Sequence, residues 1–356
     1  MKERFELAIL RNEKANDHLA WIEACRKYPE KIGYKVIDIT SKNWLDEVQN
    51  NVYDFFLARP PGYIDYYKRL YDERIYIISE ILKLPVYPTL NEILIYENKR
   101  MLSYFLKARK IRHPETWIFY NEEETIEFSE KCNFPVVAKT SIGGGGSGVS
   151  ILRTRKEIKE YINKSFSAKG VTRSYLPNIR KGNYLERISN RLANPGKSIE
   201  YFREKKNNAI IDPQKWFVIF QEYIKTDYEW RCVVVGDSYF GHKKLRNIGE
   251  MISGTSRVSW DYPDEELLDF VRKIVGENNF WSQAIDIFYN AEKGYLVNEM
   301  QCFWGSKNSH QMILDGRPGR FVNRDGHWKF EEGNFNSNNS YDLRMEHVLK
   351  IMGNRK

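Results

Sequence analysis

The sequence has no apolar run long enough to cross a membrane, and the apolar stretch near its N-terminus is too short for a secretory signal. It has only four cysteines, and none has the spacing of a metal site: Cys25, Cys132, Cys232 and Cys302. We therefore expect reduced thiols in a cytoplasmic protein with no membrane partner. The sequence also lacks a long lysine and arginine block and any nucleic-acid motif, so its formal net charge of +8 does not favour a nucleic-acid partner.

The chain has 356 residues, of which 42% are hydrophobic, enough for two or three globular domains with cores of their own. In roughly the first 90 residues, expected strands alternate with expected helices. The strands are expected at 5–10, 34–39, 52–58 and 84–87, and the main helices at 17–28 and 66–82. This alternation predicts a doubly wound α/β domain with a parallel sheet over residues 1–90.

The next region combines lysines with a glycine-rich segment. Lys99 lies in an expected helix over 89–109, and Lys139 ends the apolar strand 134–139. Five glycines follow within residues 143–148, before another strand at 149–152. A glycine-rich turn between strands lets backbone N–H groups close over a polyanion, and Lys139 would reach the same phosphates. The alternatives are a flexible hairpin tip and, for Lys99, an ordinary surface lysine.

The glycine-rich segment matches neither the Walker pattern nor the dinucleotide fingerprint, because no helix follows it directly and no Gly-Lys-Ser/Thr is present. Residues 164–213 are polar and basic with weak periodicity. We interpret them as an insertion that is either a lid or a solvated surface excursion.

Basic side chains follow one another on the strands expected at 229–235 and 239–246. Lys244 and Arg246 are two residues apart, so they are expected to face the same side. We predict an antiparallel meander from 216 to 301, interrupted by one helix at 264–276. It would place Arg231, Lys244 and Arg246 where they stabilise a phosphoryl-transfer transition state. A solvated basic strand face is the alternative.

Two apolar segments at 284–288 and 295–301 flank a Lys-Gly turn and predict a hairpin. Pairing would bring Asp286 near Glu299 and Gln301, which are two apart and share a face. Such oxygen ligands on rigid backbone suit Mg²⁺. An ordinary hairpin with an acid at each end is the alternative. Beyond Trp304 we expect a final helix over 340–352 and see no chemistry in it.

Taken in order, these signals resemble the ATP-grasp superfamily, in particular the branch that contains the ribosomal-protein glutamate ligases. The resemblance extends from Lys99 to Gly305 and is strongest in the segment QEYIKTDYEWRCVVVGD at 221–237. It implies an ATP-grasp fold of two lobes with the nucleotide between them, with an N-terminal lobe at 91–224 and a C-terminal, metal-binding lobe at 225–356. The α/β domain at 1–90 would precede them.

The resemblance also implies roles for individual residues. The nucleotide would be bound by two lysines, the glycine-rich loop, the hinge and a ribose ligand: Lys99, Lys139, Gly143, Gly146, Gly148, Glu222, Tyr223, Ile224 and Glu229. Arg231 and Arg246, with Lys244 beside them, would face the transferred phosphate. Asp286, Glu299 and Gln301 would hold two Mg²⁺ ions, which Mn²⁺ could replace.

The chain departs from the family where Gln301 replaces an asparagine and where Ala284 replaces an arginine of the peptide ligases, which argues against a D-alanine ligase. The resemblance implies an ATP-dependent carboxylate–amine ligase that works through an acyl phosphate, with small-molecule or peptide substrates and, by analogy, a homodimer. The alternatives are a kinase that phosphorylates a hydroxyl group and a non-catalytic nucleotide-binding module.

Overall fold

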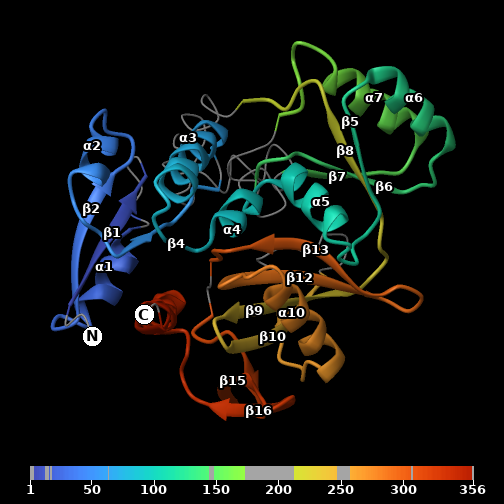
Figure 1. Ribbon diagram of the computed structural model, residues 1–356. Helices are drawn as coiled ribbons and strands as arrows, with labels where there is room; N and C mark the ends of the chain where they lie inside the picture. Colours follow the sequence, from blue (N-terminus) through green and yellow to red (C-terminus); the bar gives the residue numbers. More distant parts are fainter. Residues whose placement is uncertain are drawn as a thin grey trace, which may run out of the picture.

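The computed structural model describes residues 4–12, 16, 18–62, 64–143, 148–172, 212–246, 257–305 and 308–354. Within them the chain forms three sheets, which occupy different parts of the molecule in Figure 1. Gly146 and residues 173–211 of the predicted insertion lie outside the described residues.

The first sheet is parallel and has the strand order β2-β1-β3-β4. Its strands are β1 (Phe5–Arg11), β2 (Ile32–Asp38), β3 (Phe55–Leu57) and β4 (Val86–Tyr87). The helices between them are α1 (Leu19–Arg26), α2 (Trp44–Gln49) and α3 (Asp65–Tyr76), which continues as a π-helical segment, Ile77–Ile81. Near-continuous apolar runs such as Leu7–Leu10, which is fully buried, are typical of strands covered on both faces. The predicted α/β domain with a parallel sheet is therefore confirmed.

The C-terminal helix α11 (Tyr341–Asn354) packs against this first domain and not against its sequence neighbours alone. The ring of Tyr341 lies 4.9 Å from that of Trp21 in α1, and Asn338 Nδ2 donates to the Ala20 carbonyl at 2.8 Å. In Figure 1 this red helix lies beside the blue first domain. Residues from the C-terminal end of the chain therefore complete the hydrophobic core of the first domain.

The second sheet is antiparallel, with the order β5-β8-β6-β7. Its strands are β5 (Thr116–Phe119), β6 (Val136–Lys139), β7 (Val149–Leu152) and β8 (Val218–Glu222). Helices α6 (Glu122–Lys131) and α7 (Arg155–Ser165) cover one face, and α4 (Leu90–Ile95) and α5 (Lys99–Ala108) lead into the sheet. The Asn121 side chain caps α6 by accepting from the Glu124 N–H at 3.1 Å.

The third sheet has eight strands and follows the path β13-β12-β9-β10-β15-β14, with β11 on β10 and β16 on β15. The strands are β9 (Tyr228–Val235), β10 (Ser238–Leu245), β11 (Arg257–Ser259), β12 (Ser282–Asn290), β13 (Gly294–Gln301), β14 (Ile313–Leu314), β15 (Arg317–Arg324) and β16 (His327–Glu332). Helix α10 (Glu265–Glu277) packs its apolar stripe on one face, and a short 3₁₀ segment, Ser337–Ser340, precedes α11.

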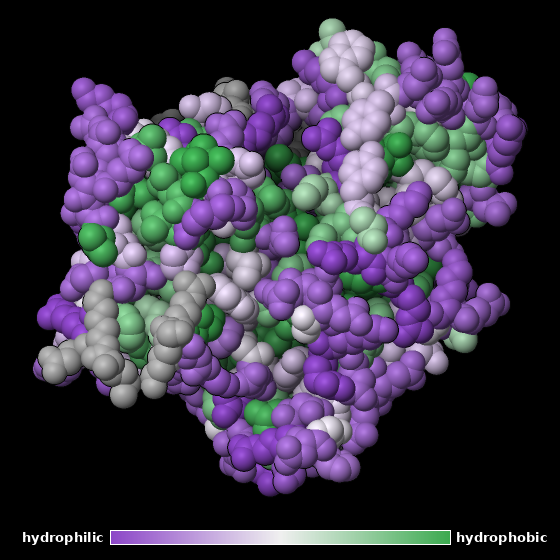
Figure 2. Space-filling view, viewed as in Figure 1, coloured by the Kyte–Doolittle hydropathy of each residue, from purple (hydrophilic) through white to green (hydrophobic). Residues whose placement is uncertain are grey.

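One prediction about this sheet is wrong, and the strands after Trp304 were not predicted. The strands do not form a simple meander, because β8 belongs to the second sheet and both β10 and β12 pair with β9. The region after Trp304 contains β14, β15 and β16 as well as a helix. Asp325-Gly326, between the apolar segments of β15 and β16, is the hairpin signal that indicates two of these strands. Figure 2 shows a mainly hydrophilic surface on this face of the molecule, with a hydrophobic patch in the region of α3.

Candidate active site

The hairpin of β12 and β13 brings the predicted metal ligands to one face of the third sheet. Asp286 lies directly opposite Glu299, and Ala284 lies opposite Gln301. Residues opposite each other on antiparallel strands point to the same side, so Asp286, Glu299 and Gln301 share a face, as the sequence predicted.

A β-bulge next to this pair adds a residue that the sequence analysis missed. The register shifts between Asp286 and Ile287, and Asn298 is left without an opposite partner on β12. The bulge turns Asn298 to the same face as Glu299, where its Oδ1 accepts from Lys139 Nζ at 2.9 Å and its Nδ2 donates to Glu229 Oε1 at 2.6 Å. Strict alternation would have placed this side chain on the other face, so the sequence pattern gave no signal for it.

Asp286 is bound by two cations from the neighbouring strands. Arg231 on β9 donates from Nε and Nη2 to the two carboxylate oxygens, both at 2.8 Å, and Lys244 Nζ on β10 lies 2.6 Å from Oδ2. Burial by itself would raise the pKa of Asp286, but Arg231 and Lys244 outweigh it and hold that pKa well below its usual range. The Asp286 carboxylate is therefore ionised, and the two cations balance its negative charge within the sheet.

Glu229 continues this network on β9. Its Oε2 lies 2.6 Å from Lys244 Nζ, and its Oε1 accepts the hydrogen bond from Asn298. Burial raises the pKa of Glu229 despite Lys244. Both oxygens already have partners, so a ribose at the predicted position would have to share them.

Two lysines approach the same face: Lys99 from α5 and Lys139 from the second sheet. Lys99 Nζ lies 3.3 Å from Glu299 Oε1, and it also donates to the Gly143 carbonyl. Lys139 is buried, and burial lowers its pKa to about 8. This surface therefore carries four cations among three carboxylates, and Glu97 beside Gln301 is a fourth carboxylate, so the side chains of opposite charge are equal in number.

The two described ends of the glycine-rich segment lie next to these lysines: Lys99 Nζ donates to the Gly143 carbonyl, and the Thr140 N–H donates to the Gly148 carbonyl at 2.7 Å. A Cβ atom on Gly148 would lie 1.7 Å from Thr140 Oγ1, so only glycine fits there. Gly143 has a φ of 136°, a value that residues with a side chain rarely adopt. The Lys99 N–H donates to the Ser141 carbonyl at 2.7 Å and anchors this segment to the start of α5.

The predicted hinge begins at Glu222, the last residue of β8. Glu222 Oε2 accepts from the Glu115 N–H at 3.2 Å, and Ile224 is buried. Arg246 donates from Nη1 to the Tyr223 hydroxyl at 3.2 Å. The structure thus places Arg246 at the hinge, while Arg231 and Lys244 bind Asp286.

The donor set can be tested against a magnesium ion by its chemistry. Among the described residues, no three His, Cys, Asp or Glu side chains lie close enough together to hold a metal. Glu299 and the amide oxygen of Gln301 are hard donors on one face, and Gln301 Nε2 is held by Glu97 Oε1 at 2.9 Å. These three residues can hold a metal ion only if the Asp286 carboxylate binds the ion in addition to Arg231 and Lys244.

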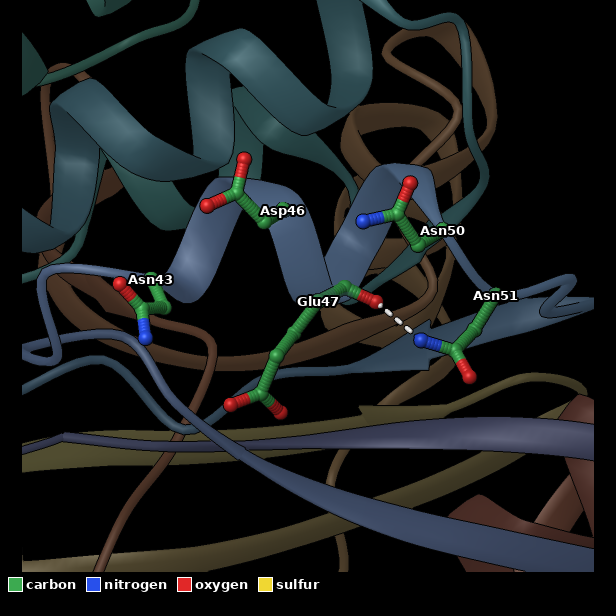
Figure 3. Close-up of a pocket in the computed structure, with 5 residues that line it drawn as sticks. All are labelled: Asn43, Asp46, Glu47, Asn50 and Asn51. Atoms are coloured by element: carbon green, nitrogen blue, oxygen red, sulfur yellow. Dashed lines mark hydrogen bonds between the residues drawn. The ribbon is translucent and has the colours of Figure 1, made fainter.

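A separate hollow of about 330 Å³ lies on the surface around α2, far from these residues in the fold (Figure 3). It is lined by Asn43, Asp46, Glu47, Asn50 and Asn51, and the Asn51 amide donates to the Glu47 carbonyl at 2.8 Å. It contributes no residue to the site on the third sheet.

Comparison with solved structures shows which fold carries this site. N5-carboxyaminoimidazole synthetase from Staphylococcus aureus, complexed with ADP, matches with a TM-score of 0.56 at 11% identity over 91% of this chain and 83% of that one. D-alanine–D-alanine ligase from Bacillus anthracis matches with a TM-score of 0.53 at 12% identity over 99% of this chain and all of that one. Residues 103–211 match the family described as carbamoyl-phosphate synthase L chain, ATP binding domain. The chain has the ATP-grasp fold.

The chain is also similar in sequence to ligases. It is 25% identical over 282 residues to the α-aminoadipate–LysW ligase LysX of Saccharolobus solfataricus, covering 76% of this chain and 84% of that protein. It is 24% identical over 282 residues to the glutamate–LysW ligase ArgX of Sulfurisphaera tokodaii, covering 76% and 80%.

The predicted superfamily, fold and class of ATP-dependent carbon–nitrogen ligase are therefore confirmed, with ATP as the nucleotide. The roles of the individual site residues stay predictions. Among the described residues, no helix has both the length and the apolar character needed to span a membrane.

Proposed function

We propose that this chain joins a carboxylate to an amine at the expense of ATP, through an acyl phosphate. The observation that carries the proposal is the convergence of Lys99 and Lys139 from one lobe with Arg231, Asp286 and Glu299 from the other. A triphosphate between them would meet cations on both sides, which is what phosphoryl transfer requires.

In the first step a carboxylate oxygen attacks the γ-phosphorus, the bond to the β-γ bridging oxygen breaks, and ADP leaves. Lys139 and Arg231 would stabilise the charge that spreads over the transferred phosphoryl group. In the second step the amine nitrogen attacks the acyl carbon and phosphate leaves. Holding both reactants in one site supplies much of the rate, because the encounter is no longer bimolecular.

We also propose Mg²⁺ at Glu299 and Gln301, with Asp286 shared. When bound, the ion would neutralise phosphate oxygens and polarise the γ-phosphorus. The protein's own contribution is to hold those oxygens on rigid strands and to keep Lys99 within reach of Glu299.

The acids in the names of the two relatives, glutamate and α-aminoadipate, are the substrates to test first. The three-domain division at 1–90, 91–224 and 225–356, a homodimer, peptide or small-molecule substrates and a cytoplasmic location complete the proposal. The location is supported by the sequence and by the four cysteines, all of which are free thiols.

Hydroxylamine trapping tests the function directly. The protein, ATP, Mg²⁺ and hydroxylamine should give ADP and a hydroxamate only when a suitable acid is added. Glu299→Gln should abolish this activity, and Glu292→Gln in the exposed turn of the same hairpin should not. ADP release that no acid stimulates would count against a ligase, and a stable phosphorylated product without an amine would indicate a kinase.

A further inference from the structure

His242 on β10 ends a row of side chains that crosses the third sheet. Glu299 on β13 lies opposite Asp286 on β12, Asp286 lies opposite Arg231 on β9, and Arg231 lies opposite His242. Opposite residues share a face, so His242 lies on the site face, about 4.8 Å from Arg231 across one strand spacing. Sequence analysis singled out Lys244 and Arg246 on this strand and passed over His242.

The hydrogen bond at one ring nitrogen fixes which tautomer of His242 is present. Nδ1 lies 2.9 Å from the Gln311 carbonyl oxygen, which can only accept, so Nδ1 carries the hydrogen. In the neutral ring Nε2 is then the nitrogen with a free lone pair. A base with its lone pair at Nε2 is therefore built into β10.

That carbonyl is itself held in place by a buried polar network. Gln311 Nε2 donates to Asn336 Oδ1 at 2.9 Å, and Ser340 Oγ donates to the same oxygen at 2.7 Å. Gln311, Asn336 and Ser340 are all buried, so the network is rigid. The loop after the β12–β13 hairpin thus holds His242 in the tautomer that has its lone pair at Nε2.

We propose that His242 is the general base for the amine substrate, an inference that rests on the ligase function proposed above. The amine arrives as an ammonium group, and Nε2 accepts one of its protons. The freed lone pair attacks the acyl carbon, the C–N bond forms, and the bond from the acyl carbon to the phosphate oxygen breaks. The phosphate leaves with that electron pair and takes the second N–H proton, and the imidazolium then returns its proton to solvent.

The charges around the ring make the pKa of this base depend on whether the acyl phosphate is bound. Burial, and then Arg231, lower the pKa of His242 to about 4, and Lys244 acts in the same direction while Asp286 opposes it. Two uncharged groups among the described residues also lie against the ring: the Gln311 carbonyl, and Trp260, whose ring lies 5.5 Å away. An acyl phosphate at Arg231 would offset the positive charge, so the imidazole would become more basic when the intermediate is present.

A substitution that preserves the structural hydrogen bond tests the proposal. In His242→Asn the amide Nδ2 can still donate to the Gln311 carbonyl, but no basic nitrogen remains. Hydroxylamine is largely unprotonated at neutral pH and needs no base, whereas the α-amino group of glycinamide is mostly protonated. We expect hydroxamate formation within about twofold of the wild type and amide formation with glycinamide reduced about 100-fold, a typical general-base contribution.

His347→Asn is the matched control, because His347 is also buried enough for its pKa to fall to about 4 but packs against Tyr87 and Trp281. It should leave the ratio of the two rates unchanged. Equal losses with both nucleophiles, or no loss with glycinamide, would overturn the role of His242. Absence of any hydroxamate from the wild-type protein would instead overturn the ligase function itself.

Nitrogen-15 spectra of the histidine rings give a readout that needs no amine. We expect Nδ1–H with an unprotonated Nε2 for His242, and a rise of its pKa when the imido analogue of ATP and glutamate or α-aminoadipate are added. A signal from the other tautomer, or a pKa that does not rise although the nucleotide is bound, would contradict the proposal.

Discussion

Lys139 Nζ donates a 2.9 Å hydrogen bond to Asn298 Oδ1, across 159 residues of sequence. The contact joins the strand that leads into the glycine-rich segment to the strand that carries Glu299. The amide of Asn298 also reaches Glu229, so one side chain links a buried cation to a buried anion. The two sides of the proposed nucleotide site are thereby held in register before any ligand arrives.

Asn298→Ala should weaken ATP binding. Removal of the amide leaves Lys139 and Glu229 each without one buried partner, and hydrogen bonds to charged groups are worth about 1.5–3 kcal/mol. We expect the Kd for ATP, measured by titration calorimetry, to rise by at least about tenfold. Asn50→Ala on the exposed end of α2 is the control, and equal affinity in both variants would show that the link is dispensable.

Asp286→Asn should destabilise the fold as well as the site. It leaves Arg231 and Lys244 buried without their shared carboxylate, and breaking a buried ion pair costs about 3–5 kcal/mol. Urea unfolding should show this loss at neutral pH, because the low pKa of Asp286 keeps its contribution present there and loses it only in strong acid.

The control for Asp286→Asn is Asp237→Asn, which removes an exposed ion pair with Lys350. That pair should contribute less than about 1 kcal/mol. A loss for Asp286→Asn no larger than that for Asp237→Asn would mean that the cations find water or other partners.

ATP binding should weaken as the pH rises above about 8. Burial lowers the pKa of Lys139 to about 8, so in the free protein its ammonium group is charged below that pH and neutral above it. We expect the affinity to fall by up to about tenfold per pH unit above this point, since one proton must be taken up on binding. Adenosine, which has no phosphates, should bind independently of this group, and Lys139→Arg should remove the pH dependence.

Glu92 should make the protein less stable as the pH rises toward neutrality. It is fully buried in α4 and accepts from the backbone N–H groups of Trp281 and Ser282 at 2.9 and 2.7 Å. Burial raises its pKa from 4.5 to about 7, so the folded state binds its proton more tightly than the unfolded chain does. The contribution is fully present below pH 4.5 and is lost as the pH rises through about 7.

Glu92→Gln should flatten this part of the stability profile, measured by urea unfolding at several pH values, and the exposed Glu123→Gln is its control. A slope that persists in Glu92→Gln would assign the effect to another group.

Much of the architecture could be predicted from local patterns. Alternating strands and helices gave the first sheet, and the apolar segments around Lys293-Gly294 gave the hairpin on which Asp286 and Glu299 lie opposite each other. The strand that ends at Lys139 was also foreseen. These features follow from periodicity and turn residues, which act over a few neighbouring positions.

Non-local contacts escaped prediction for a physical reason. Asn298 reaches the site only because the register slips beside Asp286, and a bulge has no fixed sequence signature. His242 becomes notable only because it lies opposite Arg231 and because Gln311, from a distant loop, binds its Nδ1. The packing of α11 on α1 likewise joins the two ends of the chain.

The sequence by itself determined the parallel first sheet, the glycine-rich segment and the identity of the charged groups, because those depend on local composition and order, while the ATP-grasp fold was implied by its resemblance to that superfamily. Only the tertiary structure decided how the charges are paired: Asp286 with Arg231 and Lys244, Glu299 with Lys99, and Asn298 between Lys139 and Glu229. Pairing depends on strand register and on side chains brought together from distant parts of the chain, and in a buried site each charge must find its partner there.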